Sequence, residues 1–258
     1  MTTVPLDIQR SISLHLGGDQ PFGQLFDPPR DLGLLHRSSF HALLIEARWA
    51  TGRDEQTGAL IAHKQGRRLI GTTAYLMLLD QIGSSFEPLK PRKLSVGVNS
   101  FLRALAHFSA IQDERERKAL YALRNAFAHD YSLFNRNKND LELQHAFHLS
   151  VNSYDPAVRL PSCPWDGHYP PFPEAIPHRQ ITEVNLQAVG DVVEGVVTEV
   201  RDLHAGGQLN LRPSLPEFEM RYGMVVSVEP EPEPRPPASS TSPISINLVV
   251  VTDPDSDH

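Results

Sequence analysis

Three residues near position 125 have side chains suited to phosphoryl chemistry. Arg124, Asn125 and His129 fall within six consecutive positions. Asn125 and His129 are four apart, so on a helix both side chains lie on one surface. Arg124 is offset by about 100°, but its long stem can reach over the same area. An arginine, an amide and an imidazole that converge on one area can hold and cleave a phosphodiester.

One phosphodiester that such a set could cleave is that of RNA. There the 2′-hydroxyl adjoins the scissile phosphate, so neither an external nucleophile nor a metal is required. His129 supplies an imidazole that can take or give a proton near neutral pH. Arg124 offers a planar, always charged fork for the phosphate oxygens, and Asn125 a neutral hydrogen bond to the imidazole or the phosphate. One histidine does not easily act as both base and acid, and a symmetric dimer would supply two.

The surrounding pattern predicts helices that position this set. The stretch 119–131 reads as the last turns of a helix over about 114–129, which Asp113 and Glu116 open with a capping-box pattern. Apolar residues recur at helical spacing in three more stretches, about 38–50, 67–82 and 98–111. The segment 83–92 reads as a loop with two prolines. Four amphipathic helices joined by short loops indicate a mainly α fold, a helical bundle.

The rest of the chain divides by composition. A strand at 141–151 is expected to form a small β-hairpin with 132–134, and a valine-rich helix is expected at about 182–203. The tail contains two expected strands, at 218–228 and 244–252, around a Pro-rich run. The predicted organisation is an irregular N-terminal segment at 1–35, a helical bundle plus hairpin at 36–152, a Pro-rich loop at 153–181, a helix that packs on the bundle at 182–212, and a Pro-rich, partly flexible tail at 213–258.

Charge is uneven along the sequence. The net charge of −7 argues against indiscriminate nucleic-acid binding by the whole chain. Residues 1–140, however, carry 18 Lys and Arg against 14 Asp and Glu. The weak candidates for RNA binding near the Arg–His pair are Arg115, Arg117, Lys118, Arg136 and Lys138. A run of this kind is also typical of a solvated helix face.

Other features bear on location and on metals. The single cysteine, Cys163, excludes an intramolecular disulfide, and no apolar run is long enough to span a bilayer. We therefore expect a cytoplasmic protein without membrane contact. His145 and His148 are three apart on the expected strand and point to opposite faces, which is a poor arrangement for one metal. The sequence predicts neither a metal site nor a cofactor.

The bare pairing of an arginine with a histidine a few residues later is weak evidence. Chance alone produces such pairs in a chain of this composition, and Arg10 with His15 is another. The context sets Arg124 and His129 apart. They lie at the end of a helix, a polar residue follows the arginine, and Tyr131 completes a His-x-Tyr sequence.

The stretch 123–131, Leu-Arg-Asn-Ala-Phe-Ala-His-Asp-Tyr, resembles the signature of HEPN domains (higher eukaryote and prokaryote nucleotide-binding domains). The resemblance implies an α-helical bundle that acts as a metal-independent ribonuclease, without cofactor, as a homodimer with a composite active site. It implies a catalytic set of Arg124, Asn125 and His129. The R-x4-H-x-Y form is similar to toxins that are paired with a nucleotidyltransferase antitoxin, which implies Tyr131 as a possible modification site. An antitoxin or another defence-system protein is then an expected partner.

Structural roles are the alternatives for the same residues. Arg124 could serve as an ion-pair partner, His129 as a helix C-terminal residue favoured by the dipole, and Tyr131 as a packed, hydrogen-bonded tyrosine. Three hypotheses stay open: a HEPN-type endoribonuclease, a HEPN-like module that binds RNA, nucleotide or protein without cutting, and an unrelated helical scaffold.

Overall fold

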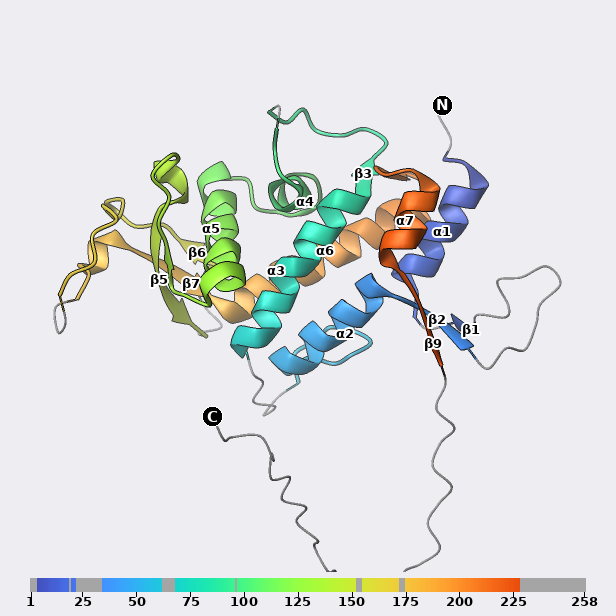
Figure 1. The fold of residues 1–258 in the computed structure, drawn as a ribbon, viewed down its shortest axis with the longest axis horizontal. Coiled ribbons are helices and arrows are strands. Elements are labelled where there is room, and N and C mark those ends of the chain that lie inside the picture. Colours follow the sequence, from blue (N-terminus) through green and yellow to red (C-terminus); the bar gives the residue numbers. More distant parts are fainter. Residues whose placement is uncertain are drawn as a thin grey trace, which may run out of the picture. The chain divides into compact units, whose positions relative to one another are not determined.

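The computed structural model describes residues 4–18, 20–21, 34–61, 68–95, 97–151, 155–171 and 175–227. Residue contacts group 1–227 as one compact unit, which runs across the boundaries expected after residues 35, 152, 181 and 212. The described part is mainly α-helical, as predicted (Figure 1). Its helices are α1 (Leu6–Leu16), α2 (Ser39–Thr51), α3 (Arg68–Ser85), α4 (Ser100–Phe108), α5 (Glu114–Asp130), α6 (Leu186–Ala205) and α7 (Leu215–Tyr222).

Three small sheets join segments that are distant in sequence. The first has the order β1–β2–β9 and the second pairs β3 with β8, all antiparallel. The third has the order β4–β5–β7–β6, in which β5 and β7 are parallel. The strands are β1 (Gln20–Pro21), β2 (Leu34–Ser38), β3 (Phe86–Pro88), β4 (Phe134–Asn135), β5 (His145–Ser150), β6 (Val158–Arg159), β7 (Ile181–Asn185), β8 (Leu209–Leu211) and β9 (Gly223–Ser227). Short 3-10 turns lie at Leu141–Leu143 and His178–Gln180.

Helix α3 lies at the centre of the core and contacts α2, α4, α5 and α6. Tyr75, Leu76 and Leu79 are fully buried on it. Gly83 allows α4 to approach closely, because a Cβ at this position would overlap the carbonyl group of Ser100. The first residue of α4 is thereby held against the last turns of α3.

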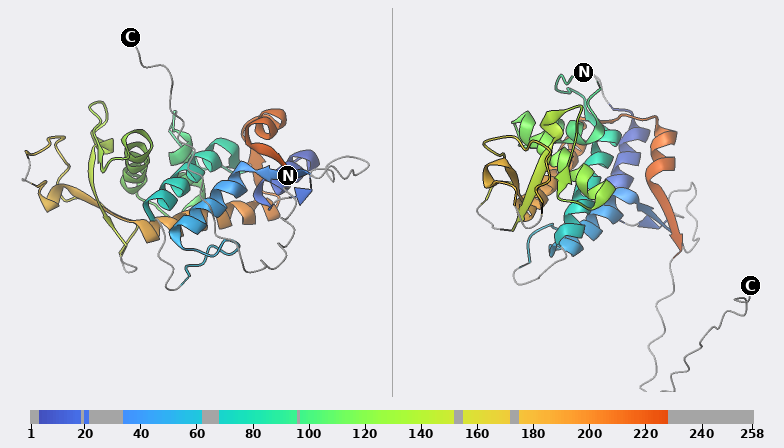
Figure 2. Two further views of the ribbon diagram at one scale, coloured as in Figure 1. Left: turned by 60° about the horizontal axis from the view of Figure 1, so that its bottom comes forward. Right: turned by 60° about the vertical axis from the view of Figure 1, so that its left-hand side comes forward.

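Helix α5 lies between this bundle and the third sheet (Figures 1 and 2). Phe147, Val158 and Val184 face the common core from the sheet. The expected hairpin is present, with β4 paired to β5. Helix α6 follows β7 and packs on α3 and α4, so the predicted packing of a helix in this part of the chain is confirmed.

A buried ionic network ties α2 and α3 to α6. Both oxygens of Glu194 accept hydrogen bonds from the Arg48 guanidinium, at 2.9 and 2.7 Å. The Tyr75 hydroxyl donates to the same carboxylate at 2.5 Å. Nearby, Arg53 donates to Asp191 at 2.6 Å. Because each charged group has a close partner, the network is satisfied and its role is structural.

Several expectations were wrong at the level of single elements. Residues 1–35 were expected to be irregular, but α1 forms there and buries Ile12 and Leu16 in the core. The predicted helix at 182–203 begins as strand β7, because pairing with β5 extends the chain as far as Asn185. The predicted strand at 218–228 is the end of α7 followed by β9, and β6 interrupts the Pro-rich loop.

Smaller differences concern the edges of elements. Helix α3 continues to Ser85 and β3 follows it, where a loop was predicted at 83–92. Helix α4 ends at Phe108 rather than near 111, and residues 141–143 form a 3-10 turn before β5. The expected strand at 244–252 lies outside the described residues. In the described ranges, no helix is both long and apolar enough to cross a membrane.

Candidate functional site

Helix α5 carries the Arg–His pair and begins and ends at defined caps. The Asp113 side chain accepts the Arg115 N–H at 2.8 Å, and the acidic residues of the first turn suit the positive end of the helix dipole. The buried side contacts the core through Leu120, Leu123 and Phe127. Arg124, Asn125 and His129 therefore lie on the side of α5 that faces away from the core or at its margin.

Arg124 is held by a carboxylate that the sequence pattern did not single out. Its Nε donates to Oδ2 of Asp80, on α3, at 2.6 Å. The other oxygen of Asp80 accepts the Ser100 hydroxyl, at the start of α4, at 2.8 Å. The side chains of Arg124 and Asp80 are 28% and 23% exposed. Three helices therefore fix one arginine, which remains partly open to solvent.

Arg124 and Asn125 are in contact, and neither makes a hydrogen bond to His129. Nη1 of Arg124 lies 3.3 Å from Oδ1 of Asn125, while Nη2 has no hydrogen-bond partner within the described part of the chain. His129 is exposed, and its ring makes no hydrogen bond to any described residue. Five residues of helix separate Arg124 and His129 by about 140° around the axis. Asp80 on α3 holds Nε of Arg124, and no hydrogen bond joins Arg124 to His129, so convergence of the two side chains stays a prediction.

Tyr131 has an unusual backbone. It ends α5 with a φ of 49°, the left-handed region, and is the one non-glycine residue with positive φ in the described ranges. The Ser132 N–H reaches back to the Ala126 carbonyl at 3.1 Å, which closes the helix end. Tyr131 is 57% exposed, and its ring contacts that of Phe127 at a centroid distance of 6.2 Å. Its hydroxyl makes no hydrogen bond to a described residue, so of the packed, hydrogen-bonded alternative the structure shows a ring contact and no hydrogen bond.

Three of the five basic candidates lie in the first turns of α5. Arg115 pairs with Asp113 at 3.0 Å, and Arg117 donates to the Ile111 carbonyl at 2.9 Å. Lys118 pairs with Glu142, and this hydrogen bond raises the pKa of Lys118. Arg136 and Lys138 are exposed and precede the turn at Leu141–Leu143 that contacts α5.

Lys118, which pairs with Glu142, lies near the start of α5. Lys118 and His129 are 11 positions apart, which is about 16 Å along the helix axis. Three of the five candidates, Arg115, Arg117 and Lys118, already bind protein groups, so they offer less charge to a nucleic acid than their number indicates.

The sequence reasoning missed Asp80 and Ser100. A signal for Asp80 was present, because a lone carboxylate in the apolar run 75–82 needs a partner when the helix is buried. No comparable signal marked Ser100, which depends on the close packing at Gly83.

The two histidines of the third sheet lie in different surroundings. His145 is buried, where Nδ1 lies 2.8 Å from the Thr182 hydroxyl and burial lowers the pKa of the ring. His148 is exposed, on the opposite face, as predicted. Among the described residues, no three His, Cys, Asp or Glu side chains gather as metal ligands would.

Comparisons with family models, with curated proteins and with solved structures find no match to this chain. The geometry of α5 and its neighbours is accordingly the basis for the functional proposal.

Proposed function

We propose that this chain is a metal-independent endoribonuclease of the HEPN type. The observation that carries the proposal is the way in which the Arg124 guanidinium is held. Asp80 fixes one nitrogen of its guanidinium, and Nη2 remains without a partner among the described residues, on a partly exposed helix that also presents His129. A fixed arginine with donors to spare is suited to phosphate oxygens.

The proposed reaction is an internal transesterification. The 2′-oxygen of RNA forms a bond to the neighbouring phosphorus while the bond from phosphorus to the 5′-oxygen breaks. One proton leaves the 2′-hydroxyl for a base, and one is delivered to the departing 5′-oxygen. Arg124 stabilises the charge that develops on the phosphate oxygens. The products carry a 2′,3′-cyclic phosphate and a 5′-hydroxyl.

A second copy of the chain would supply what one copy lacks. Arg124 and His129 diverge around α5, so the arginine of one copy would act with the histidine of the other. Support for a contact face comes from α3, where Ile70 and Met77 are 53% and 49% exposed. They lie two turns apart on one side of the helix, and Asp80 follows one turn later. This apolar strip leads toward the Asp80–Arg124 pair.

We further propose a role as a toxin or an antiphage-defence effector, with an antitoxin or another defence protein as partner. The exposed Tyr131 hydroxyl, two residues after His129, supports a regulatory modification close to the site. A bulky, charged group there would obstruct RNA.

RNA cleavage by the purified chain in EDTA tests the proposal. We expect wild type to cut and both Arg124→Ala and His129→Ala to lose at least about 100-fold in rate, the usual scale for a general acid or base. His148→Ala and Arg221→Ala, which alter exposed residues elsewhere, serve as matched controls and should cut normally. Cleavage that is unchanged in the Arg124 and His129 variants would overturn the assignment.

A dimer can be tested with the same variants. Mixing inactive Arg124→Ala with inactive His129→Ala should restore part of the activity if the site is composite, because one of the two shared sites keeps both residues. Each variant alone should stay inactive.

A second candidate function is a HEPN-like module that binds RNA, nucleotide or protein without cutting. The angle of about 140° between Arg124 and His129 around α5 favours it, as does the ion pair in which Asp80 already engages the guanidinium. RNA binding by a wild-type protein that never cuts, weakened by Arg124→Ala, would select this function.

A further inference from the structure

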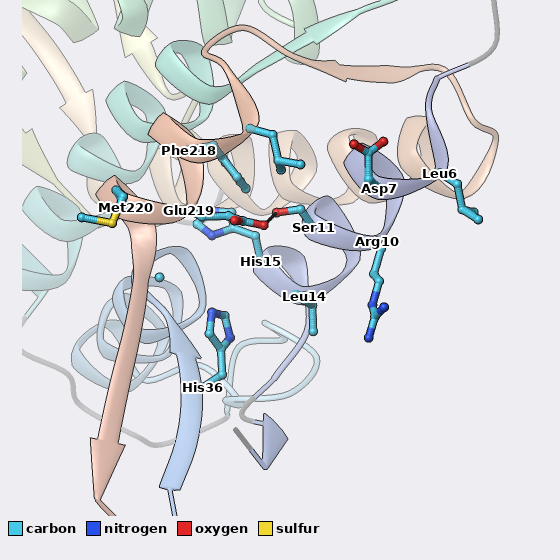
Figure 3. Close-up of a pocket in the computed structure, with 12 residues that line it drawn as sticks. Leu6, Asp7, Arg10, Ser11, Leu14, His15, His36, Phe218, Glu219 and Met220 are labelled. Carbon is cyan, nitrogen blue, oxygen red and sulfur yellow. Dashed lines mark hydrogen bonds between the residues drawn. The ribbon is translucent and has the colours of Figure 1, made fainter. Parts of the chain in front are cut away.

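A pocket of about 860 Å³ lies between α1 and α7 (Figure 3). These two helices are distant from α5, which carries Arg124 (Figure 1). Its apolar lining comes from both helices and includes Leu14, Leu215 and Phe218. His36 of β2 and Gly223 of β9 border it at the side of the first sheet. This volume is in the range of pockets that take small organic ligands.

The floor of the pocket is aromatic and uncharged. Phe218 and His15 are buried, with their rings edge to face at a centroid distance of 4.7 Å. Burial, with a smaller contribution from His36, lowers the pKa of His15 to about 3, so its imidazole is neutral at neutral pH. Nε2 of His15 has no hydrogen-bond partner among the described residues.

One carboxylate occupies the middle of the lining. The Ser11 hydroxyl donates to Oε1 of Glu219 at 3.2 Å, across the gap between α1 and α7. Figure 3 shows the Glu219 side chain directed at Ser11 and next to His15, whereas Asp7 and Arg10 extend away from this pair. The polar centre of the pocket is therefore negative, with apolar walls on both sides.

We propose that this pocket binds a small organic cation, an amine with an aromatic or aliphatic body. Its apolar body lies against Phe218, Leu14 and Leu215, and its ammonium group lies against Glu219. Charge complementarity selects this class, because an anion would meet the Glu219 carboxylate in a mostly apolar site. The inference is independent of RNA cleavage.

Calorimetric titration of the full chain with three indoles of similar shape tests the proposal. Tryptamine carries the cation, tryptophol a neutral hydroxyl and indole-3-acetate an anion. We expect tryptamine to bind with a Kd of about 1 mM or tighter and about tenfold more tightly than tryptophol, with indole-3-acetate weakest. Absence of tryptamine binding at millimolar concentration, or equal binding of all three, would overturn the proposal.

Variants locate the site. Glu219→Gln should abolish the preference for tryptamine and leave tryptophol binding unchanged. Because Glu219 is exposed, we expect the variant to fold, so a lost preference reports on the binding site. Glu217→Gln is the matched control, because Glu217 is on the same helix, pairs with Arg221 at 3.1 Å and does not line the pocket. A preference for tryptamine that survives Glu219→Gln would show that the cation is not bound at Glu219 and would overturn the proposal.

Discussion

Arg124 and Asp80 form a partly buried ion pair at 2.6 Å between α5 and α3, and the arginine in it belongs to the candidate catalytic set. The pair gives Arg124 both a structural and a chemical role. Asp80 fixes the direction of the guanidinium, and Ser100 fixes Asp80. A substitution at Asp80 therefore tests whether the arginine must be held in place as well as present.

The Asp80–Arg124 pair should show measurable coupling in stability. In a double-mutant cycle of Asp80→Ala and Arg124→Ala, we expect a coupling of about 1 kcal/mol in the free energy of unfolding, because the pair is shielded from solvent only in part. Urea unfolding of the four proteins measures it. Strictly additive effects would show that the contact contributes nothing to stability.

Asp80→Asn should lower RNA cleavage without removing Arg124. The amide keeps the shape of the side chain but no longer attracts the guanidinium as a charge. We expect a loss in kcat of about tenfold, smaller than the loss for Arg124→Ala, since the arginine is still present but less well placed. A normal kcat in Asp80→Asn would remove the positioning role.

Tyr131 should tolerate glycine better than alanine. Its φ of 49° is unfavourable for any residue that carries a Cβ, by roughly 1–2 kcal/mol relative to glycine. We therefore expect Tyr131→Gly to have a free energy of unfolding about 1 kcal/mol higher than Tyr131→Ala. Denaturant titration compares the two directly, and an equal stability would contradict the left-handed cap.

His15 should make the fold sensitive to acid. Its pKa is about 3 in the folded chain, against an ordinary value of 6.5, so below pH 6.5 the unfolded chain takes up a proton that the folded chain does not. Above pH 6.5 the buried His15 does not lower the free energy of unfolding. As the pH drops from 6.5 toward 3, the free energy of unfolding falls by about 1.4 kcal/mol per pH unit.

Comparison with His15→Leu isolates this effect. Between pH 7 and 5 we expect wild type to lose about 2 kcal/mol more than the variant. Other buried histidines, such as His145, contribute to both proteins and cancel in the difference. Parallel pH curves for the two proteins would show that His15 is not buried as a neutral group.

Glu194 should be more costly to remove than its neighbour in the same helix. Glu194→Ala leaves Arg48 and the Tyr75 hydroxyl without their partner in the core, which costs about 3–5 kcal/mol in the free energy of unfolding. The matched control is Glu199→Ala, an exposed position where the change should be within about 0.5 kcal/mol. Similar losses at the two positions would contradict the network.

The sequence pattern predicted the elements whose burial is periodic. Helices α2 and α5 match their expected ranges within about two residues, and Ser38 caps α2 by accepting the His41 N–H at 3.1 Å. These helices carry apolar residues at helical spacing together with a capping residue, so local signals and tertiary packing agree.

The elements that were missed depend on partners elsewhere in the chain. Helix α1 is short and rich in Ile and Ser, so it would be marginal alone and is stabilised by burying Ile12 and Leu16. Strand β7 contains the start of a helical pattern, yet pairing with β5 determines its conformation. A local signal was available at Asn185, whose side chain caps α6 by accepting the N–H groups of Gln187 and Ala188.

The candidate site was predictable as a set of residues but not as a geometry. Arg124, Asn125 and His129 lie on α5 as expected, while the direction of Arg124 depends on Asp80 and on the close approach of α4 at Gly83. Contacts between helices of this kind leave no periodic trace in the sequence.

The pairing of β2 with β9 has a consequence for synthesis of the chain. Its register joins Leu34 to Ser227 and Ser38 to Gly223. At a synthesis rate of about 5–20 residues per second, β2 waits roughly 10–40 s for its partner to be made. Closing so long a loop also slows folding. The nascent chain thus exposes an unpaired strand for much of its synthesis, a period in which chaperones would protect it from aggregation.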